Sequence, residues 1–258
     1  MTDTHDYART TFSRRKALSL LGLAGVALVP ACRSGRSESG TTAAGATSTT
    51  AAGGSGTTAP QTGTPQTATC VLTPESTEGP FYLDLDNVRR DITDGKSGAP
   101  LELRITVVDA VGCAPIADAT VDIWHADAGG AYSSFSPGAT GQTFLRGTQV
   151  SGADGAVTFD TVYPGWYRGR AVHIHTKVHV SGSVVHTGQL YFADDATDDV
   201  YRAAPYSSRP GRDVRNAQDG IFRQAGADSA VLDVTPKGNG YAAGIVVGVE
   251  RAAAPNQA

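Results

Sequence analysis

Two histidines stand two positions apart in the stretch AVHIHTKVHV, residues 171–180. The alternation of residue types predicts a β-strand, and side chains two positions apart on a strand project from the same face. His173 and His175 would therefore present two imidazoles side by side, which is a chelating arrangement for a metal ion. Lys177 and His179 share this parity, so the pair taken alone also fits an ordinary polar face of a half-buried strand.

Tyrosines in two glycine-containing loops offer further ligands. Tyr132 follows the glycine pair in IWHADAGGAY at 123–132, and Tyr167 lies in TVYPGWYRGR at 161–170, where Tyr163 is a competing phenol. A phenol has an ordinary pKa of about 10, so it becomes a ligand only when a strongly Lewis-acidic cation stabilises the phenolate. Ferric iron is such a cation and accepts imidazole together with hard oxygen donors. These residues therefore predict an iron site on loops that a rigid scaffold presents.

That scaffold is predicted to be all-β, an antiparallel β-sandwich of about 180 residues with few short helices. Short runs rich in Val, Ile, Thr and aromatic residues alternate with turn signals such as Asp-Gly and Ser-Gly. Helical turns are expected at 194–203 and 216–226. Strands are expected at 101–110, 119–127, 155–163, 171–180, 184–192 and 240–249.

The first 32 residues have the pattern of an export signal. A basic Ser-Arg-Arg-Lys motif at 13–16 runs into an uncharged apolar stretch, and its adjacent arginines favour the twin-arginine route. Cys32 follows Val-Pro-Ala, which makes it a lipidation candidate beside simple cleavage. We therefore expect an exported protein that is either extracellular or anchored to the envelope, with a membrane tether through the Cys32 lipid as one alternative.

The remainder of the chain divides into a tether, a domain and a tail. Residues 33–69 are almost entirely Ser, Thr, Gly, Ala and Pro, which predicts a disordered tether. The folded domain is expected over 70–252 and a flexible tail over 253–258. Its two cysteines, Cys70 and Cys113, form a disulfide in an oxidising compartment or stay as two buried thiols. The formal net charge of −4 gives no indication of a nucleic-acid partner.

Five segments of the folded part carry a family resemblance in their residues and their order. They are TPESTEGPFYLD at 73–84, VDIWHADAGGAYS at 121–133, PGWYRGRAVHIH at 164–175, GQLYF at 188–192 and GYAAGIVVGV at 240–249. Any single segment is a weak signal, whereas five in this order are specific. Together they resemble the intradiol ring-cleavage dioxygenases, the non-haem ferric enzymes that open catechols between their two hydroxyl groups.

The resemblance implies one non-haem Fe(III) per chain, held by four side chains and a water or hydroxide. It also implies that Arg170 stabilises an anionic substrate intermediate and that Gln189 lies near the substrate and oxygen. Phe81 and Tyr82 belong to a segment that resembles the family's cover over the mouth of the site, and they are candidate substrate-binding residues. The implied iron ligands are Tyr132, Tyr167, His173 and His175.

The implied reaction joins a catechol-type substrate with O2 and gives a muconate-type diacid that contains both oxygen atoms. Tyr167 leaves the metal in this reaction and acts as a catalytic base. Only five residues separate Tyr167 from His173, fewer than in the best-known members, so the resemblance does not choose among catechols. The N-terminal helical segment that builds the dimer in some branches is also missing, and a homo-oligomer stays one alternative for the oligomeric state.

Two other classes of protein stay open at this point. One is a non-catalytic binding module, a β-sandwich tethered to the envelope in which the histidines are incidental. The other is a cupin-type metalloenzyme, which also uses His-X-His on a strand but wants a glutamate shortly afterwards, where this chain has Lys177 and His179. Residues expected to have structural or peripheral roles are Trp124, His125, Trp166, His179 and His186.

Overall fold

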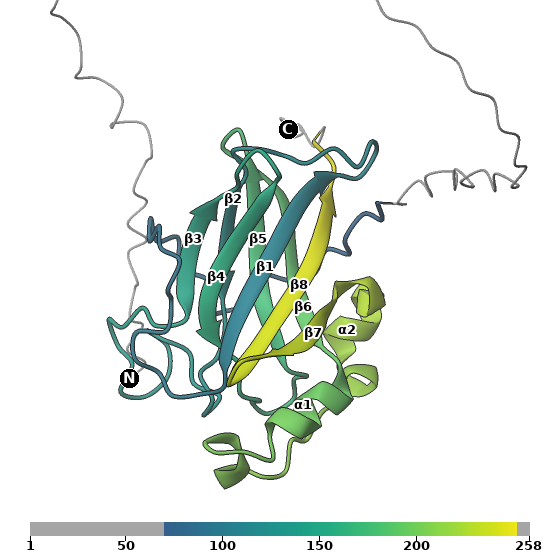
Figure 1. The fold of residues 1–258 in the computed structure, drawn as a ribbon. Coiled ribbons are helices and arrows are strands. Elements are labelled where there is room, and N and C mark those ends of the chain that lie inside the picture. The colour runs from purple at the N-terminus through teal and green to yellow at the C-terminus, as the bar shows by residue number, and fades with distance from the viewer. Residues whose placement is uncertain (1–69, 252–258) are drawn as a thin grey trace, which may run out of the picture. The chain divides into compact units, whose positions relative to one another are not determined.

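The computed structural model describes residues 70–251, and this part of the chain forms eight strands in two layers packed face to face (Figure 1). The strands are β1 (Pro100–Asp109), β2 (Thr120–Trp124), β3 (Arg146–Val150), β4 (Ala156–Val162), β5 (His173–Val180), β6 (Ser183–Phe192), β7 (Val231–Lys237) and β8 (Gly240–Val249). Their order is β3-β2-β5-β6-β7-β8-β1-β4. β7 joins the layers, because its first residues pair with β6 and the rest pair with β8. The predicted all-β sandwich is confirmed.

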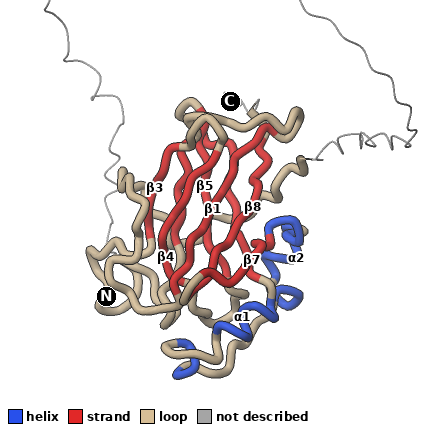
Figure 2. Tube along the Cα trace, in the orientation of Figure 1, coloured by secondary structure: helices blue, strands red, loops and turns tan. Residues whose placement is uncertain are grey.

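The helices are short, as expected, and Figure 2 shows them gathered toward one end of the strands. They are α1 (Asp194–Val200), α2 (Gly220–Ala225) and three 3-10 turns, η1 (Tyr206–Ser208), η2 (Asn216–Gln218) and η3 (Ala227–Ala230). Asp219 caps α2, since its side chain accepts hydrogen bonds from the backbone of Ile221 and Phe222. The same helix ends at Gly226, whose φ of 61° is the left-handed conformation that favours glycine.

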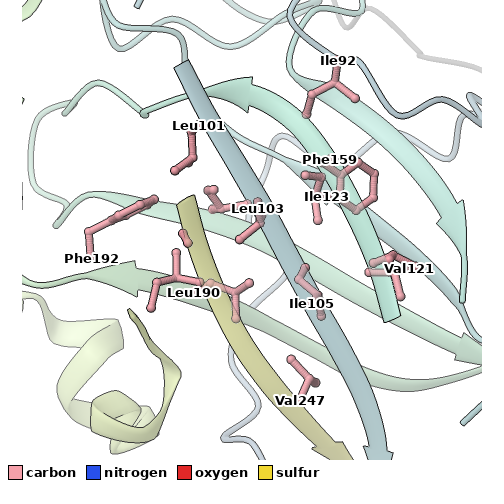
Figure 3. Packing of buried hydrophobic residues seen from close by; sticks show 14 of the residues in the cluster. Ile92, Leu101, Leu103, Ile105, Val121, Ile123, Phe159, Leu190, Phe192 and Val247 are labelled. Carbon is pink, nitrogen blue, oxygen red and sulfur yellow. The ribbon is translucent and has the colours of Figure 1, made fainter. Parts of the chain in front are cut away.

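The core lies between the layers and follows from the alternation of residues along the strands. In β1 the inward-facing Leu101, Leu103 and Ile105 are 2% exposed or less, while Glu102 and Arg104 between them face outward. Figure 3 shows these side chains meeting Phe159 and residues of the opposite layer. Each fully buried Leu or Ile contributes roughly 1.5–3 kcal/mol of transfer free energy, so this core is sufficient to hold the loops that extend from its strands.

Two details of the sheet differ from the prediction. Five of the seven strand pairs within residues 70–251 are antiparallel, but β1–β8 and β6–β7 are parallel. Two parallel neighbouring strands must be joined by a long crossover connection, so they lie far apart in the sequence. No local sequence pattern indicates that they pair. The sequence did not predict β3 and β7, because RGTQV has no apolar alternation and VLDVTPK carries two charged residues and a proline.

The strand that carries the histidine pair is buried on both faces. Ile174 and Val178 pack into the core, while His173, His175 and Lys177 on the opposite face are also buried. β5 turns into β6 through Ser181 and Gly182, whose φ values of 51° and 81° are typical of a tight two-residue hairpin. The alternative that the histidines lie on the polar, exposed face of a half-buried strand is therefore wrong, since other parts of the chain cover that face.

Cys70 and Cys113 are joined by a disulfide with a Cα–Cα distance of 5.4 Å. It ties the beginning of the described chain to the turn that follows β1. The export signal with Cys32, the tether and the C-terminal tail lie outside the described residues. Within residues 70–251, no helix is long and apolar enough to cross a membrane.

Candidate active site

His173 and His175 lie side by side, with their Nε2 atoms 3.1 Å apart. The Nδ1 atom of His173 is 2.7 Å from the carbonyl oxygen of Ala171, and because a carbonyl only accepts, Nδ1 carries the hydrogen and Nε2 presents its lone pair. Burial lowers the pKa of His173 to about 3 and lowers the pKa of His175 well below its ordinary value. Both imidazoles are therefore neutral at physiological pH, the form in which imidazole binds a metal.

Both predicted phenols meet this pair. The hydroxyl of Tyr167 is 3.1 Å from Nε2 of His173, and the Tyr132 ring lies 5.6 Å from the Tyr167 ring and 6.1 Å from the His175 ring. Tyr132 is 2% exposed, and its hydroxyl has no hydrogen-bond partner in the described part of the chain. Burial raises the pKa of both tyrosines, so each phenol is protonated unless a cation lies beside it.

Glycines allow the two tyrosine loops to touch through their backbones. A Cβ at Gly130 would lie 2.3 Å from the carbonyl oxygen of Trp166, and a Cβ at Gly165 would lie 2.3 Å from that of Ala128. Gly130 also has a φ of +80°, which other residues rarely adopt. The contact between these loops brings Tyr132 and Tyr167 to one place although 35 positions separate them in the sequence.

Tyr163, the competing phenol, lies in the core instead. It is fully buried against Phe192, and its hydroxyl is 2.9 Å from Thr197 Oγ1. His125 is likewise held by protein partners, with Nδ1 2.9 Å from the Ala126 carbonyl oxygen and Nε2 2.8 Å from Thr161 Oγ1. These observations favour Tyr167 as the second phenol of the site.

The other residues expected to be structural or peripheral have varied surroundings. His179 lies 3.1 Å from an Asp122 carboxylate oxygen, and His186 is buried on β6. Trp166 donates its ring N–H to the carbonyl oxygen of Arg209 at 3.0 Å. Trp124 stacks on the His175 ring at 4.9 Å with an angle of 7° between the planes, so it fixes the orientation of that imidazole.

Arg170 and Gln189 adjoin the cluster formed by the two phenols and the two imidazoles described above. One guanidinium nitrogen of Arg170 donates to the Tyr167 hydroxyl at 3.4 Å, and the other donates to the side-chain oxygen of Gln189. Two further residues in this network were not predicted from the sequence. Asp219 accepts from Nε of Arg170 at 2.9 Å, and the Tyr191 hydroxyl donates to Gln189 at 3.0 Å. Tyr191 belongs to the GQLYF segment, so its position next to Gln189 on the strand was the available signal.

The segment before β1 covers the histidine face. Gly79 lies directly on the His175 ring, since a Cβ there would be 3.1 Å from its Cε1 atom. Gln189 donates to the Thr77 carbonyl oxygen at 2.9 Å, and the Phe81 ring stacks on Tyr132 at 4.3 Å. Phe81 therefore borders the cluster.

Tyr82 is placed one layer further out than Phe81. Its ring packs on Trp124 at 4.8 Å, and its hydroxyl donates to Asp122 at 3.3 Å. Lys177, which the cupin alternative would replace by a glutamate, lies over the Tyr82 ring at 3.7 Å and pairs with Glu78. Tyr82 thus contacts the site through Trp124, and its role in substrate binding stays a prediction.

The donor set fits a hard, highly charged metal ion. Within residues 70–251, no three His, Cys, Asp or Glu side chains gather closely enough to hold a metal. A metal at the histidine pair would therefore take the phenols as its remaining protein ligands, and the unpartnered Tyr132 hydroxyl is available for that purpose. Two neutral nitrogens and two ionisable oxygens match the ligand preference of ferric iron.

Known proteins share sequence and fold with this chain. A family model described as "Dioxygenase" matches residues 76–217. The intradiol ring-cleavage dioxygenase of Tetranychus urticae is 32% identical, with a TM-score of 0.68 over 70% of this chain and 95% of that one. The chain belongs to the intradiol ring-cleavage dioxygenase family. This assignment leaves the cupin alternative without support.

Two further relatives place the chain within this dioxygenase family. The dioxygenase domain of a carbohydrate-binding fusion protein from Streptomyces sp. SirexAA-E is 30% identical, with a TM-score of 0.55 over 70% of this chain and 99% of that one. Catechol 1,2-dioxygenase 1 of Acinetobacter lwoffii is 40% identical over 101 residues, which are 37% of this chain and 32% of that protein. The matches with the curated relatives cover between 32% and 56% of their lengths.

Proposed function

We propose that Tyr132, Tyr167, His173 and His175 hold one non-haem Fe(III), and that the protein cleaves catechol-type rings between their two hydroxyl groups. The convergence of two neutral imidazoles with one buried and one partly buried phenol carries this proposal. The similarity to Acinetobacter lwoffii catechol 1,2-dioxygenase 1 supports it. The co-substrate is O2, and both of its atoms enter a muconate-type diacid, so catechol and O2 balance the product without a further reductant.

Bound ferric iron supplies a Lewis-acid centre for the two catechol oxygens and makes the ring reactive toward O2. The protein's own groups handle the protons and the charge. Tyr167 is only partly buried, whereas Tyr132 is buried beneath the Phe81 ring. We assign to the Tyr167 oxygen the removal of a proton from one substrate hydroxyl, a role in which general bases contribute roughly 10²–10⁴-fold.

Arg170 and Gln189 act on the substrate side of the cluster. The fixed positive charge of Arg170, 3.4 Å from the Tyr167 hydroxyl, favours negative charge on the substrate as its protons leave. Gln189 is held between Arg170 and the Thr77 carbonyl oxygen, so its amide is oriented before substrate binds. Phe81 contributes an apolar wall that excludes water from the reacting atoms.

Oxygen uptake by the iron-loaded protein tests this function directly. Catechol, protocatechuate, hydroxyquinol and larger substituted catechols form the panel, because no feature of the site selects one of them. We expect uptake of one O2 per ring opened, and a burgundy-red protein, since tyrosinate bound to Fe(III) absorbs visible light. A fully iron-loaded protein that is colourless, or that consumes no O2 with any of these catechols, would overturn the proposal.

We also propose that the enzyme is exported by the twin-arginine route, with Cys32 as the site of a lipid anchor. The basic motif at 13–16 and the disulfide between Cys70 and Cys113 support this location, since disulfides persist in oxidising compartments. Cell fractionation tests it. Replacing Arg14 and Arg15 by lysine should keep the protein inside the cell, and Cys32→Ala should release it from the membrane fraction. Export that persists without the arginine pair would contradict the route.

A further inference from the structure

The Asp219 side chain accepts four hydrogen bonds next to the candidate site, and no part of the proposed chemistry uses it. Its carboxylate is completely buried, and each oxygen has two donors. One oxygen accepts from the backbone N–H groups of Ile221 at 2.8 Å and Phe222 at 3.1 Å, and thereby caps α2. The other accepts from the backbone N–H of Ala171 at 2.8 Å and from Nε of Arg170 at 2.9 Å.

The hydrogen bonds to the second carboxylate oxygen, from Arg170 and Ala171, are not needed to cap the helix. One carboxylate oxygen satisfies the first turn of α2, and a serine or asparagine would do the same. A fully buried carboxylate is costly to desolvate unless charged and hydrogen-bonding partners surround it. Burial opposes ionisation of Asp219, yet the hydrogen bond from Ala171 and the charge of Arg170 hold its pKa below the ordinary value. The charge is thus retained where it meets Arg170.

The contact with Asp219 determines where the rest of Arg170 points. A guanidinium is planar and rigid, so holding Nε fixes the direction of both terminal nitrogens. Those nitrogens donate to the Tyr167 hydroxyl at 3.4 Å, to Gln189, and to the Tyr191 hydroxyl at 3.4 Å. Without Asp219 the side chain could rotate about its own long stem, and the orientation toward Tyr167 would be lost.

The helix α2 supports the same network from a second side. Phe222, three residues after Asp219, packs edge-on against the Tyr191 ring at 4.9 Å. Tyr191 in turn donates to Gln189 at 3.0 Å. The first turn of α2 therefore reaches both polar residues of the site, Arg170 through a carboxylate and Gln189 through an aromatic ring.

We propose that Asp219 is a positioning residue, which holds Arg170 in the orientation needed for ring cleavage and couples α2 to the active site. This inference rests on the proposed function, since the orientation matters only if Arg170 acts on a catechol. None of the hydrogen bonds of Asp219 goes to one of the four proposed ligand residues, so its contacts with the site are those with Arg170 and the Ala171 backbone.

The variant Asp219→Asn tests this role in the full-length iron-loaded protein. An amide cannot serve donors on both sides, so one set of hydrogen bonds is lost without a change of size. We expect kcat per bound iron to fall roughly 10- to 100-fold with KM changed less than about threefold, because a displaced charge affects the reacting state more than binding. Asp219→Ser, which retains a cap but cannot reach Arg170, should behave in the same way.

A matched control and a double variant separate positioning from folding. Asp194→Asn removes a carboxylate that pairs with the buried Arg212 at 2.7 Å, away from the four ligand residues, and should leave kcat unchanged. In an Arg170→Ala background, Asp219→Asn should have no further effect on kcat, because both changes remove the same interaction. Hydrogen exchange followed by mass spectrometry should show faster exchange at the Ala171 amide in either Asp219 variant, a readout that requires no activity.

The outcomes distinguish this inference from the proposed function. If wild-type protein oxidises catechols while both Asp219 variants keep kcat within about twofold, the positioning role is wrong. The same conclusion follows if the Arg170→Ala and Asp219→Asn effects on kcat multiply, since independent effects add in free energy. If the wild-type protein oxidises no catechol, the proposed function is overturned, and with it the positioning role, whatever the variants do.

Discussion

The two faces of β5 are both buried, but they are built from opposite chemistry. Ile174 and Val178 on the inner face are 0% exposed and need only complementary shape from the core. His173 and His175 on the outer face are 3% and 1% exposed, and they lie under a segment without regular secondary structure. The inner face gains free energy by burial alone, whereas the outer face requires a partner for every polar atom it buries.

The partners on the outer face are incomplete. The Nδ1 atom of His175 and the hydroxyl of Tyr132 are buried without a hydrogen-bond partner among residues 70–251. An unsatisfied buried polar group costs about 1–3 kcal/mol, so without a bound metal the outer face contributes less to the free energy of unfolding than the inner face. A cation bound at the Nε2 atoms would give the Tyr132 hydroxyl a ligand bond, and the comparison therefore predicts that changes on the two faces have separable effects on stability and on metal binding.

The largest expected effect comes from removing a ligand on the outer face. His175→Ala should reduce iron occupancy to about a tenth of the wild-type value or less and abolish the visible absorption, because it deletes one of two imidazole donors. The fold should survive, as judged by circular dichroism, because the core residues of β5 are untouched. His179→Ala is the matched control, since His179 shares the strand face but pairs with Asp122. Loss of colour in both variants would contradict the ligand assignment.

The next comparison concerns two tyrosines that lie four positions apart. Tyr167→Phe should lower kcat by at least about 100-fold and shift the visible band, because it removes a ligand that also acts as a base. Tyr163→Phe should keep both colour and kcat. It should lower the free energy of unfolding by about 1 kcal/mol, because the 2.9 Å hydrogen bond between the Tyr163 hydroxyl and Thr197 Oγ1 is lost. Bleaching by Tyr163→Phe and not by Tyr167→Phe would reverse the assignment.

A change on the inner face should show the complementary behaviour. Ile174→Ala should lower the free energy of unfolding by about 2–5 kcal/mol, because the fully buried side chain leaves a cavity in the core. The visible spectrum of the iron-loaded protein should be unchanged below the melting temperature. Val184→Ala serves as the control, since Val184 is 48% exposed on the neighbouring strand. Denaturant titration measures both, and a spectral change in Ile174→Ala would show that the faces are coupled.

The sequence predicted the inner face and the four residues that meet at the candidate site better than the polar network around them. Alternating apolar residues identified six strands, and the parity of His173 and His175 placed both imidazoles on one face. Tyr132 and Tyr167 were recognisable because each stands in a motif that also contains the glycines of its loop. These features are local, so a reading along the chain can find them.

Asp219 and the parallel strand pairs depend on contacts between distant residues. Asp219 looks like an ordinary helix cap in the sequence, and its contact with Arg170 spans 49 positions. The pairing of β1 with β8 joins the two ends of the domain, and the strand β3 has no apolar alternation along its sequence. Such contacts arise from the packing of the whole domain, and residue type at one position does not encode them.

The smallest expected effect separates a satisfied buried histidine from the ligand pair. Both ring nitrogens of His125 have protein partners, and burial lowers its pKa from 6.5 to about 4. Between these two pH values the His125 side chain is protonated in the unfolded chain but not in the folded protein. Its contribution to the free energy of unfolding is therefore fully present above about pH 6.5 and is lost as the pH falls toward about 4. The loss amounts to about 2 kcal/mol between about pH 7 and about pH 5.

His125→Gln should remove that share of the pH dependence, because glutamine has no proton to bind. Unfolding titrations at the two pH values, on wild-type and variant protein, give the difference directly. The same variant should keep the visible absorption, since His125 is not one of the proposed iron ligands. An unchanged pH dependence would mean that His125 is protonated when buried, whereas a loss of colour would place it among the groups that hold the metal.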